Sequence, residues 1–222
     1  MKVAVLASGG KDSTFSLWIS QQQYEVTSLI TVLSEEDSML YQHQSEQFAF
    51  AYAEATGFPL KIVRCLGPEE EIISLISILK TLEVEAFVIG GLLSEYQRTK
   101  FNIVGIEAGI PCYAPLWRKD QRMLLTEIVN HGFEFILCKV AAYGFKKADL
   151  AKKVDMAMVQ RLAELAQKNG VSIGGEGGEY ESLVTDAPFF TKRIVLEGIE
   201  VVFDNIRSTG KVIVRNVRTE KK

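Results

Sequence analysis

The chain has 222 residues, of which 47% are hydrophobic and 24% are charged, and its formal net charge at pH 7 is −3. This composition is typical of a globular protein, and the weak acidity disfavours a nucleic acid as the main partner. No apolar run approaches 18 residues and no signal peptide is visible, so the sequence predicts a cytoplasmic protein without a membrane segment. The length favours one principal domain with a smaller companion.

The beginning of the chain predicts a phosphate-binding loop. An apolar strand at 3–7 runs into SGGKDS at 8–13, and a helix is expected from 13 to 22. Two adjacent glycines can turn the chain tightly and let backbone N–H groups approach an anion, while the positive end of the helix points at the same spot. The spacing is not that of a Walker A loop. The expected phosphate-binding residues are Ser8, Gly9, Gly10, Lys11 and Ser13, and Asp12 is placed to hold Mg²⁺.

The rest of the first half alternates apolar runs with amphipathic segments. Strands are expected at 26–33, 60–65 and 86–91, with helices at about 41–56 and 69–82. Apolar strands separated by helices predict an α/β fold, a parallel sheet with helices on both faces. Ligands bind beyond the carboxyl ends of such strands. TVLSEED after the second strand and GGLLSEYQR after the fourth are therefore expected to face the same crevice as the phosphate loop.

Two prolines, Pro111 and Pro115, interrupt this pattern, and we place a domain boundary there. Residues 1–115 are then the first domain, and 116–222 are a smaller α+β domain. The elements expected in the second domain are helices at 121–131 and 149–168 and strands at 133–140, 193–203 and 211–217.

A second candidate site lies at residues 174–182, GGEGGEYES. Three carboxylates, Glu176, Glu179 and Glu181, stand there among four glycines, which predicts a loop with its backbone open to a ligand. In an extended stretch Glu179 and Glu181 point to one face and Tyr180 to the other. Such a loop suits a cationic substrate, a metal or a protonated amine, and a solvated acidic surface loop is the alternative.

The remaining reactive side chains form no motif. Cys65, Cys112 and Cys138 are far apart, which predicts core thiols in a reducing cytoplasm rather than a disulfide, zinc or iron–sulfur site. His43 and His131 are isolated on helical segments, and we interpret both as structural or solvent-facing.

SGGKDS after a first strand resembles the PP-loop of the N-type ATP pyrophosphatases, which have a HUP-like sheet. Together with EGGEYES at 176–182, GGLLSEYQRTK at 90–100 and APLW at 114–117, it makes nearly the whole chain similar to the diphthine ammonia ligase family. The resemblance implies amidation of diphthine on translation elongation factor 2 by ammonium, using ATP. The reaction passes through an acyl-adenylate and gives diphthamide, AMP and pyrophosphate. Ser182 stands where we expect threonine in this family and keeps the hydroxyl, and the extra C-terminal domains of larger relatives are absent from this sequence.

The resemblance also implies residue roles. Lys11, the loop N–H groups and Mg²⁺ held by Asp12 stabilise the departing pyrophosphate. Arg98 clamps a phosphate or the substrate carboxylate, or else makes a surface ion pair. The trimethylammonium group of diphthine needs aromatic faces or negative charge, for which Tyr180, Tyr96 and Trp117 are candidates, although core packing is the preferred interpretation of Trp117. Glu176, Glu179 or Glu181 balance that cation or hold ammonium and accept its proton, with Glu179 and Glu181 as the catalytic candidates.

Two other functions stay open at this point. One is a PP-loop tRNA-modifying enzyme, although the separated cysteines count against thiolation. The other is a non-catalytic ATP-binding sensor of the HUP architecture. The sequence also leaves open whether the chain forms a homo-oligomer.

Overall fold

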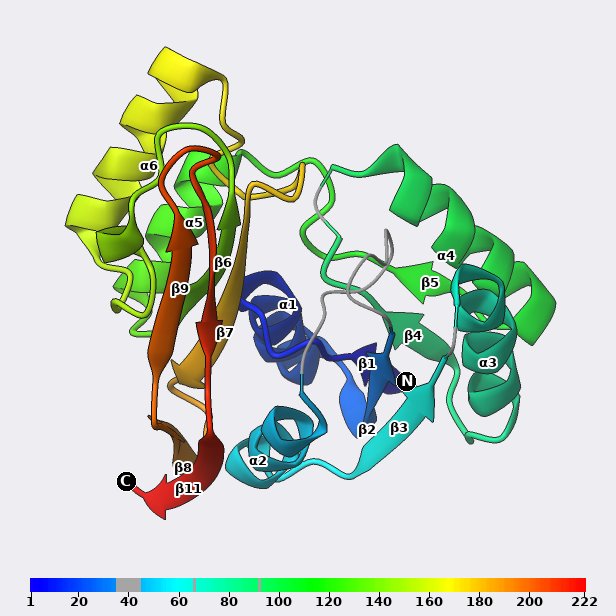
Figure 1. The fold of residues 1–222 in the computed structure, drawn as a ribbon. Coiled ribbons are helices and arrows are strands. Elements are labelled where there is room, and N and C mark those ends of the chain that lie inside the picture. Colours follow the sequence, from blue (N-terminus) through cyan, green and yellow to red (C-terminus); the bar gives the residue numbers. More distant parts are fainter. Residues whose placement is uncertain (35–44, 66, 92) are drawn as a thin grey trace. The chain divides into compact units, whose positions relative to one another are not determined.

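A computed structural model of the chain describes residues 1–34, 45–65, 67–91 and 93–222 (Figure 1). They fall into two compact units, Met1–Arg118 and Lys119–Lys222. Residues 35–37 of TVLSEED, Leu92 of GGLLSEYQR, His43 and the start of the helix predicted at 41–56 lie outside the described residues. Within the described ranges, no helix is both long enough and apolar enough to span a membrane.

The first unit is a five-stranded parallel sheet in the order β3-β2-β1-β4-β5, which confirms the predicted fold. Its elements are β1 (Lys2–Leu6), α1 (Lys11–Gln23), β2 (Glu25–Leu33), α2 (Glu46–Thr56), β3 (Leu60–Arg64), α3 (Pro68–Lys80), β4 (Ala86–Val88), α4 (Glu95–Ala108) and β5 (Cys112–Tyr113). Helix α4 was not predicted. It begins after Ser94, whose side chain accepts a hydrogen bond from the backbone N–H of Gln97.

Both faces of this sheet are covered because its central strands are apolar throughout. Ala4 and Leu6 of β1 pack into a cluster with side chains of α3 and α4. Successive strand residues point to opposite faces, so Val3 and Val5, both fully buried, face the other side. Helices α1 and α2 lie on that side (Figure 1). Full burial of a valine or leucine side chain stabilises the fold by about 1.5 to 3 kcal/mol. The central strands therefore give a rigid base to the loop that follows β1.

The second unit is built on antiparallel strands. Its elements are α5 (Gln121–Asn130), β6 (Glu134–Ala141), the short 3-10 helix η1 (Lys147–Asp149), α6 (Met156–Asn169), β7 (Tyr180–Asp186), β8 (Lys192–Glu197), β9 (Glu200–Asp204), β10 (Thr209–Ile213) and β11 (Asn216–Lys221). One sheet has the order β7-β6-β10-β9, and β8 and β11 form a separate two-stranded ribbon.

Three predicted elements of this unit were wrong. The single strand at 193–203 divides at Gly198, which has φ +63°, so that β8 pairs with β11 while β9 pairs with β10. The strand at 211–217 divides in the same way into β10 and β11. The helix predicted from residue 149 begins only at Met156, where the side chain of Asp155 accepts a hydrogen bond from the N–H of Met158.

An ion pair holds the segment before α6 in place. The Nε and Nη2 atoms of Arg161 donate to the two carboxylate oxygens of Asp149 at 2.8 and 2.7 Å. Asp149 also accepts a hydrogen bond from the backbone N–H of Lys146, and Asp149 is only 5% exposed. Because Arg161 meets the charged carboxylate of Asp149 in a two-pronged geometry, this pair anchors η1 to α6.

Candidate functional site

The loop between β1 and α1 has the geometry of an anion-binding turn. Gly9 has φ +68°, and a Cβ at this position would collide with the ring of Phe48 on α2, so only glycine fits. Gly10 is the N-cap of α1 and has no side chain that could bond the N–H groups of the first helical turn. The positive end of the helix therefore favours an anion at this loop.

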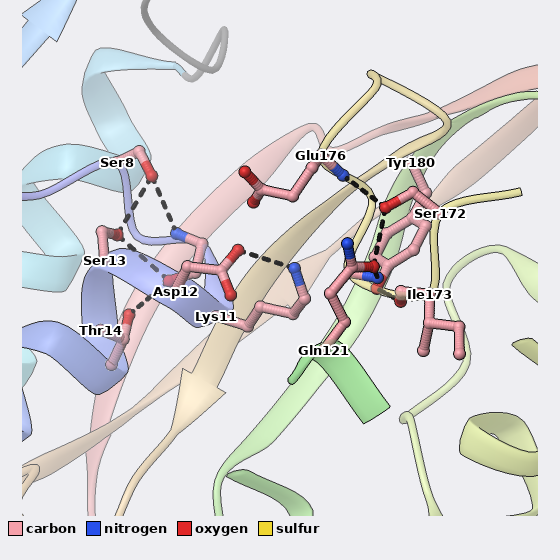
Figure 2. A network of polar contacts seen from close by, with 12 residues as sticks. Ser8, Lys11, Asp12, Ser13, Thr14, Gln121, Ser172, Ile173, Glu176 and Tyr180 are labelled. Carbon is pink, nitrogen blue, oxygen red and sulfur yellow. Dashed lines mark hydrogen bonds and ion pairs between the residues drawn. The ribbon is translucent and has the colours of Figure 1, made fainter. Parts of the chain in front are cut away.

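The two serines of this loop, Ser8 and Ser13, lie together (Figure 2). Their hydroxyl oxygens are 3.1 Å apart, and the N–H of Gly10 lies 3.3 Å from the hydroxyl of Ser8. Behind them, Thr14 donates to the carbonyl of Gly10 and accepts a hydrogen bond from the buried hydroxyl of Tyr52 on α2. Burial raises the pKa of Tyr52, which keeps this hydroxyl a donor. Thr14 and Tyr52 support the loop from behind, and sequence analysis did not identify them because they are 38 residues apart.

Lys11 and Asp12 pair with each other, with Nζ 2.7 Å from Oδ2. The second carboxylate oxygen of Asp12 is buried and has no hydrogen-bond partner among the described residues. A buried, unpartnered anionic oxygen beside a helix N-terminus fits a bound cation. Magnesium commonly takes only one or two protein carboxylates together with substrate phosphates. Asp12 can supply one such carboxylate. No group of three or more potential metal ligands occurs in the described part of the chain.

Arg98 lies in the first turn of α4. It makes a surface ion pair, which was the alternative predicted for this residue. Its Nε donates to Glu95 at 2.6 Å, and its guanidinium lies 5.5 Å from the ring centroid of Trp117. Arg118 also contacts this ring, at 6.0 Å, and donates to Glu95 at 3.3 Å. The hydrogen bond from Arg98, followed by its charge and by Arg118, lowers the pKa of Glu95. Two guanidinium groups thus converge on one carboxylate.

The preferred interpretation of Trp117 as a core residue was wrong. Its neighbour Leu116 is fully buried, whereas Trp117 is only partly buried and its ring carries the two arginines. Tyr96 is 43% exposed, and Lys100 Nζ lies 5.5 Å from the centroid of its ring. Both rings already contact cations, which shows that their faces are accessible to positive charge.

We call residues 172–179 the glycine loop. Six of its backbone N–H groups are bonded within the second unit, which differs from the expected open backbone. The amides of Ser172 and Gly177 donate to Glu179, at 2.9 and 2.8 Å. The other four, at residues 174, 175, 176 and 178, donate to Gln121, to Ser172 or to a loop carbonyl. With these donors occupied, the loop is poorly suited to bind an anion and better suited to a cation or an N–H-bearing ligand.

The four predicted residues of this segment have different surroundings. Glu179 is turned onto its own loop, and Glu181 on β7 accepts a hydrogen bond from Lys139 on β6 at 3.0 Å. Tyr180 is 4% exposed, its hydroxyl donates to the carbonyl of Ile173 at 2.5 Å and its ring meets Phe145 edge-on. We expected this ring to face a cation. In the structure it packs inside the second unit instead.

A glycine is required at the centre of this loop. Gly175 has φ +77°, and a Cβ there would lie 2.9 Å from the carbonyl oxygen of Tyr180. Any larger side chain would force the loop away from β7. Glu176 follows directly and is partly buried, with its N–H bonded to the hydroxyl of Ser172 at 3.2 Å (Figure 2).

The three cysteines lack the features of sulfur-transfer residues. All three are free thiols. Burial raises the pKa of Cys112 to about 12, and it also raises the pKa of Cys65 and Cys138. A nucleophilic cysteine needs a lowered pKa, so the environment of these thiols disfavours the thiolation alternative.

Comparison with known proteins identifies the family. The sequence model described as "Diphthamide synthase N-terminal domain" matches residues 1–112, and the one described as "Diphthamide synthase C-terminal domain" matches residues 120–217. A relative from Danio rerio, "Diphthine--ammonia ligase", is 34% identical over all of this chain and 98% of its own length. One of the same name from Schizosaccharomyces pombe is 36% identical, and 98% of this chain covers 39% of that protein.

Among solved structures, a predicted subunit of tRNA methyltransferase from Methanocaldococcus jannaschii is 16% identical, with a TM-score of 0.48 over 85% of this chain and 98% of its own. The two family models together account for both units described above, and the Danio rerio relative matches end to end. The chain belongs to the diphthamide synthase family, the diphthine–ammonia ligases, which form a C–N bond.

Proposed function

We propose that this chain amidates diphthine on translation elongation factor 2 with ammonium and ATP, through an acyl-adenylate, giving diphthamide, AMP and pyrophosphate. The observation that carries the proposal is the loop between β1 and α1. It combines a glycine-capped helix N-terminus with a buried, unpartnered oxygen of Asp12. This combination fits a nucleotide triphosphate with its magnesium ion.

The phosphate loop performs the activation step. A carboxylate cannot be amidated directly because its oxide is a very poor leaving group, so the diphthine carboxylate attacks the α-phosphorus of ATP and displaces pyrophosphate. Lys11 Nζ and the N–H groups at the start of α1 stabilise negative charge on the departing pyrophosphate. Asp12 would hold a magnesium ion, which would supply Lewis-acid stabilisation of the same charge. The hydroxyl groups of Ser8 and Ser13 are further hydrogen-bond donors for the phosphates in this loop.

The second unit, within the acceptor domain predicted at 116–222, receives the acceptor. The internally bonded amides of the glycine loop favour a cationic or N–H-bearing ligand, which fits the trimethylammonium group of diphthine or the incoming ammonium. Glu176 and Glu181 supply negative charge and accept the proton that ammonium loses before the resulting ammonia attacks the acyl-adenylate and displaces AMP. Glu179 and Tyr180 contribute through the shape of the loop. In the first unit, considered by itself, Tyr96 has an exposed ring of the kind that binds a quaternary nitrogen.

Arg98 assists the activation step when a stronger anion is present. In the structure its partner is the exposed carboxylate of Glu95, a pairing worth little in water. A phosphate or the substrate carboxylate can replace that partner in a two-pronged hydrogen bond. The three free thiols fit a reducing compartment, and we place the reaction in the cytoplasm.

The test is the identity of the products. The purified chain is incubated with ATP, Mg²⁺, ammonium and diphthine-bearing elongation factor, and nucleotides are separated by chromatography while the factor is analysed by mass spectrometry. Stoichiometric AMP and a mass change from carboxylate to amide are expected, with no AMP when the factor lacks diphthine. Stoichiometric ADP, or AMP release that depends on tRNA instead, would refute the proposal.

A further inference from the structure

We propose that Gln121, the first residue of α5, is a positioning residue that sets the shape of the glycine loop for the acceptor. This inference rests on the proposed function of that loop. The side-chain oxygen of Gln121 accepts two hydrogen bonds from the loop. One comes from the hydroxyl of Ser172 at 2.9 Å and the other from the backbone N–H of Gly174 at 2.7 Å (Figure 2).

The chemistry of the contact fixes the orientation of the Gln121 amide. A backbone N–H can only donate, so the atom that faces Gly174 is the carbonyl oxygen and not the NH₂ group. The hydroxyl of Ser172 then gives its proton to the same oxygen and keeps its lone pairs for another donor. That donor is the backbone N–H of Glu176 at 3.2 Å. Gln121 therefore acts through Ser172 on the backbone of Glu176, whose carboxylate is proposed to accept a proton from ammonium.

Helix α5 gives this contact a rigid base. Asp120 caps the helix by accepting a hydrogen bond from the N–H of Met123 at 2.8 Å, and Leu124, Leu125 and Ile128 are buried. Glu179 binds the other side of the loop, but it belongs to the loop itself. Gln121, by contrast, contacts the loop from a different element, helix α5. A change at Gln121 is thus expected to release the loop without unfolding the unit.

Two substitutions separate anchoring from other roles. Gln121→Leu removes the acceptor oxygen, whereas Gln121→Glu keeps an oxygen that can accept from both Ser172 and Gly174 but loses the NH₂ group. Gln160→Leu is the matched control, because Gln160 on α6 also makes two side-chain contacts, with Arg122 and Glu164, in the same unit but away from the loop. The measurements are amide hydrogen exchange, ATP affinity by calorimetry, and the apparent KM for diphthine-bearing elongation factor.

We expect Gln121→Leu to accelerate exchange at Gly174 and Glu176 and to raise the KM for the factor about tenfold, as the loss of two hydrogen bonds implies. ATP affinity stays unchanged in all variants, and Gln121→Glu and Gln160→Leu stay close to wild type. An equal rise in KM and in hydrogen exchange in Gln121→Glu and Gln121→Leu would overturn the proposal, because the NH₂ group rather than the oxygen would then be the group that matters. Faster exchange with an unchanged KM would also overturn it. Failure of the wild-type chain to amidate the factor would instead refute the proposed function, while the exchange data would still test the anchoring.

Discussion

The amino group of Lys11 lies 2.7 Å from the Oδ2 oxygen of Asp12, so the two charged residues of the phosphate loop neutralise each other in the structure. Lys11 is 4% exposed, and Asp12 keeps its other oxygen without a partner among the described residues. A nucleotide with its magnesium ion offers each residue a partner of opposite charge. When the nucleotide binds with its magnesium ion, the ion pair between Lys11 and Asp12 is therefore replaced by contacts of Lys11 with phosphate and of Asp12 with magnesium.

Lys11→Met and Asp12→Asn are expected to lower AMP formation at least about 100-fold, because each removes a charge that stabilises the departing pyrophosphate. Both substitutions keep the approximate volume of the side chain, so circular dichroism should be unchanged. Lys80→Met, in the exposed last turn of α3, is the control and should keep its turnover. Full turnover in both loop variants would rule out the proposed role of this pair.

Glu176→Gln is expected to weaken use of diphthine-bearing elongation factor by about 1 to 3 kcal/mol and to leave ATP binding close to wild type. Removing the charge of a partly buried carboxylate affects a cationic ligand most. Calorimetry with ATP and mass spectrometry of the factor separate the two effects. Loss of nucleotide binding instead would assign the glycine loop to the ATP site.

Glu179→Gln should act on the loop itself. Its carboxylate accepts hydrogen bonds from Ser172 and Gly177 through different oxygens, and an amide can accept through only one of them. We expect faster hydrogen exchange at one or both amides. Glu181→Gln is the comparison, since its pair with the partly exposed Lys139 is worth only about 0 to 1 kcal/mol. Unchanged exchange in Glu179→Gln would show that the loop does not depend on this carboxylate.

Cys112 should resist alkylation in the folded protein. Burial raises its pKa to about 12, so its thiolate fraction at pH 8 is about 10⁻⁴. Because a raised pKa favours the neutral thiol, the rate of reaction with iodoacetamide should rise about tenfold per pH unit from pH 8 to 10 without levelling off. Peptide mass spectrometry follows the labelling, and the unfolded chain should react at all three cysteines. A plateau near pH 9 would mean an exposed thiol.

Arg161→Met is expected to cost about 3 kcal/mol of unfolding free energy, because it leaves the carboxylate of Asp149 buried without its main partner. Urea denaturation measures the change. Arg218→Met removes an arginine paired with Glu197 at an exposed site, where water screens the charges, and should cost far less unfolding free energy than Arg161→Met. Similar losses in both variants would argue against a buried anchor at Asp149.

Local features of the fold could be predicted from the sequence, whereas contacts between distant segments could not. The strand, glycine turn and helix of residues 2–23 follow from adjacent residues. The contact between Gln121 and Ser172 joins positions 51 residues apart, and a glutamine at the start of a helix gives no signal of it. The division of the predicted strand at Gly198 depends on which strands its two halves pair with, and this is decided by the sheet and the ribbon they join rather than by the local pattern.

The internally bonded amides of the glycine loop also affect when the chain loses its conformational entropy. A glycine-rich segment has many accessible conformations, and ordering it at the moment of binding would weaken affinity for any ligand. Here Gln121, Ser172 and Glu179 order the segment when the unit folds. The entropic penalty therefore falls on folding stability, and the loop can meet its ligand as a preorganised surface.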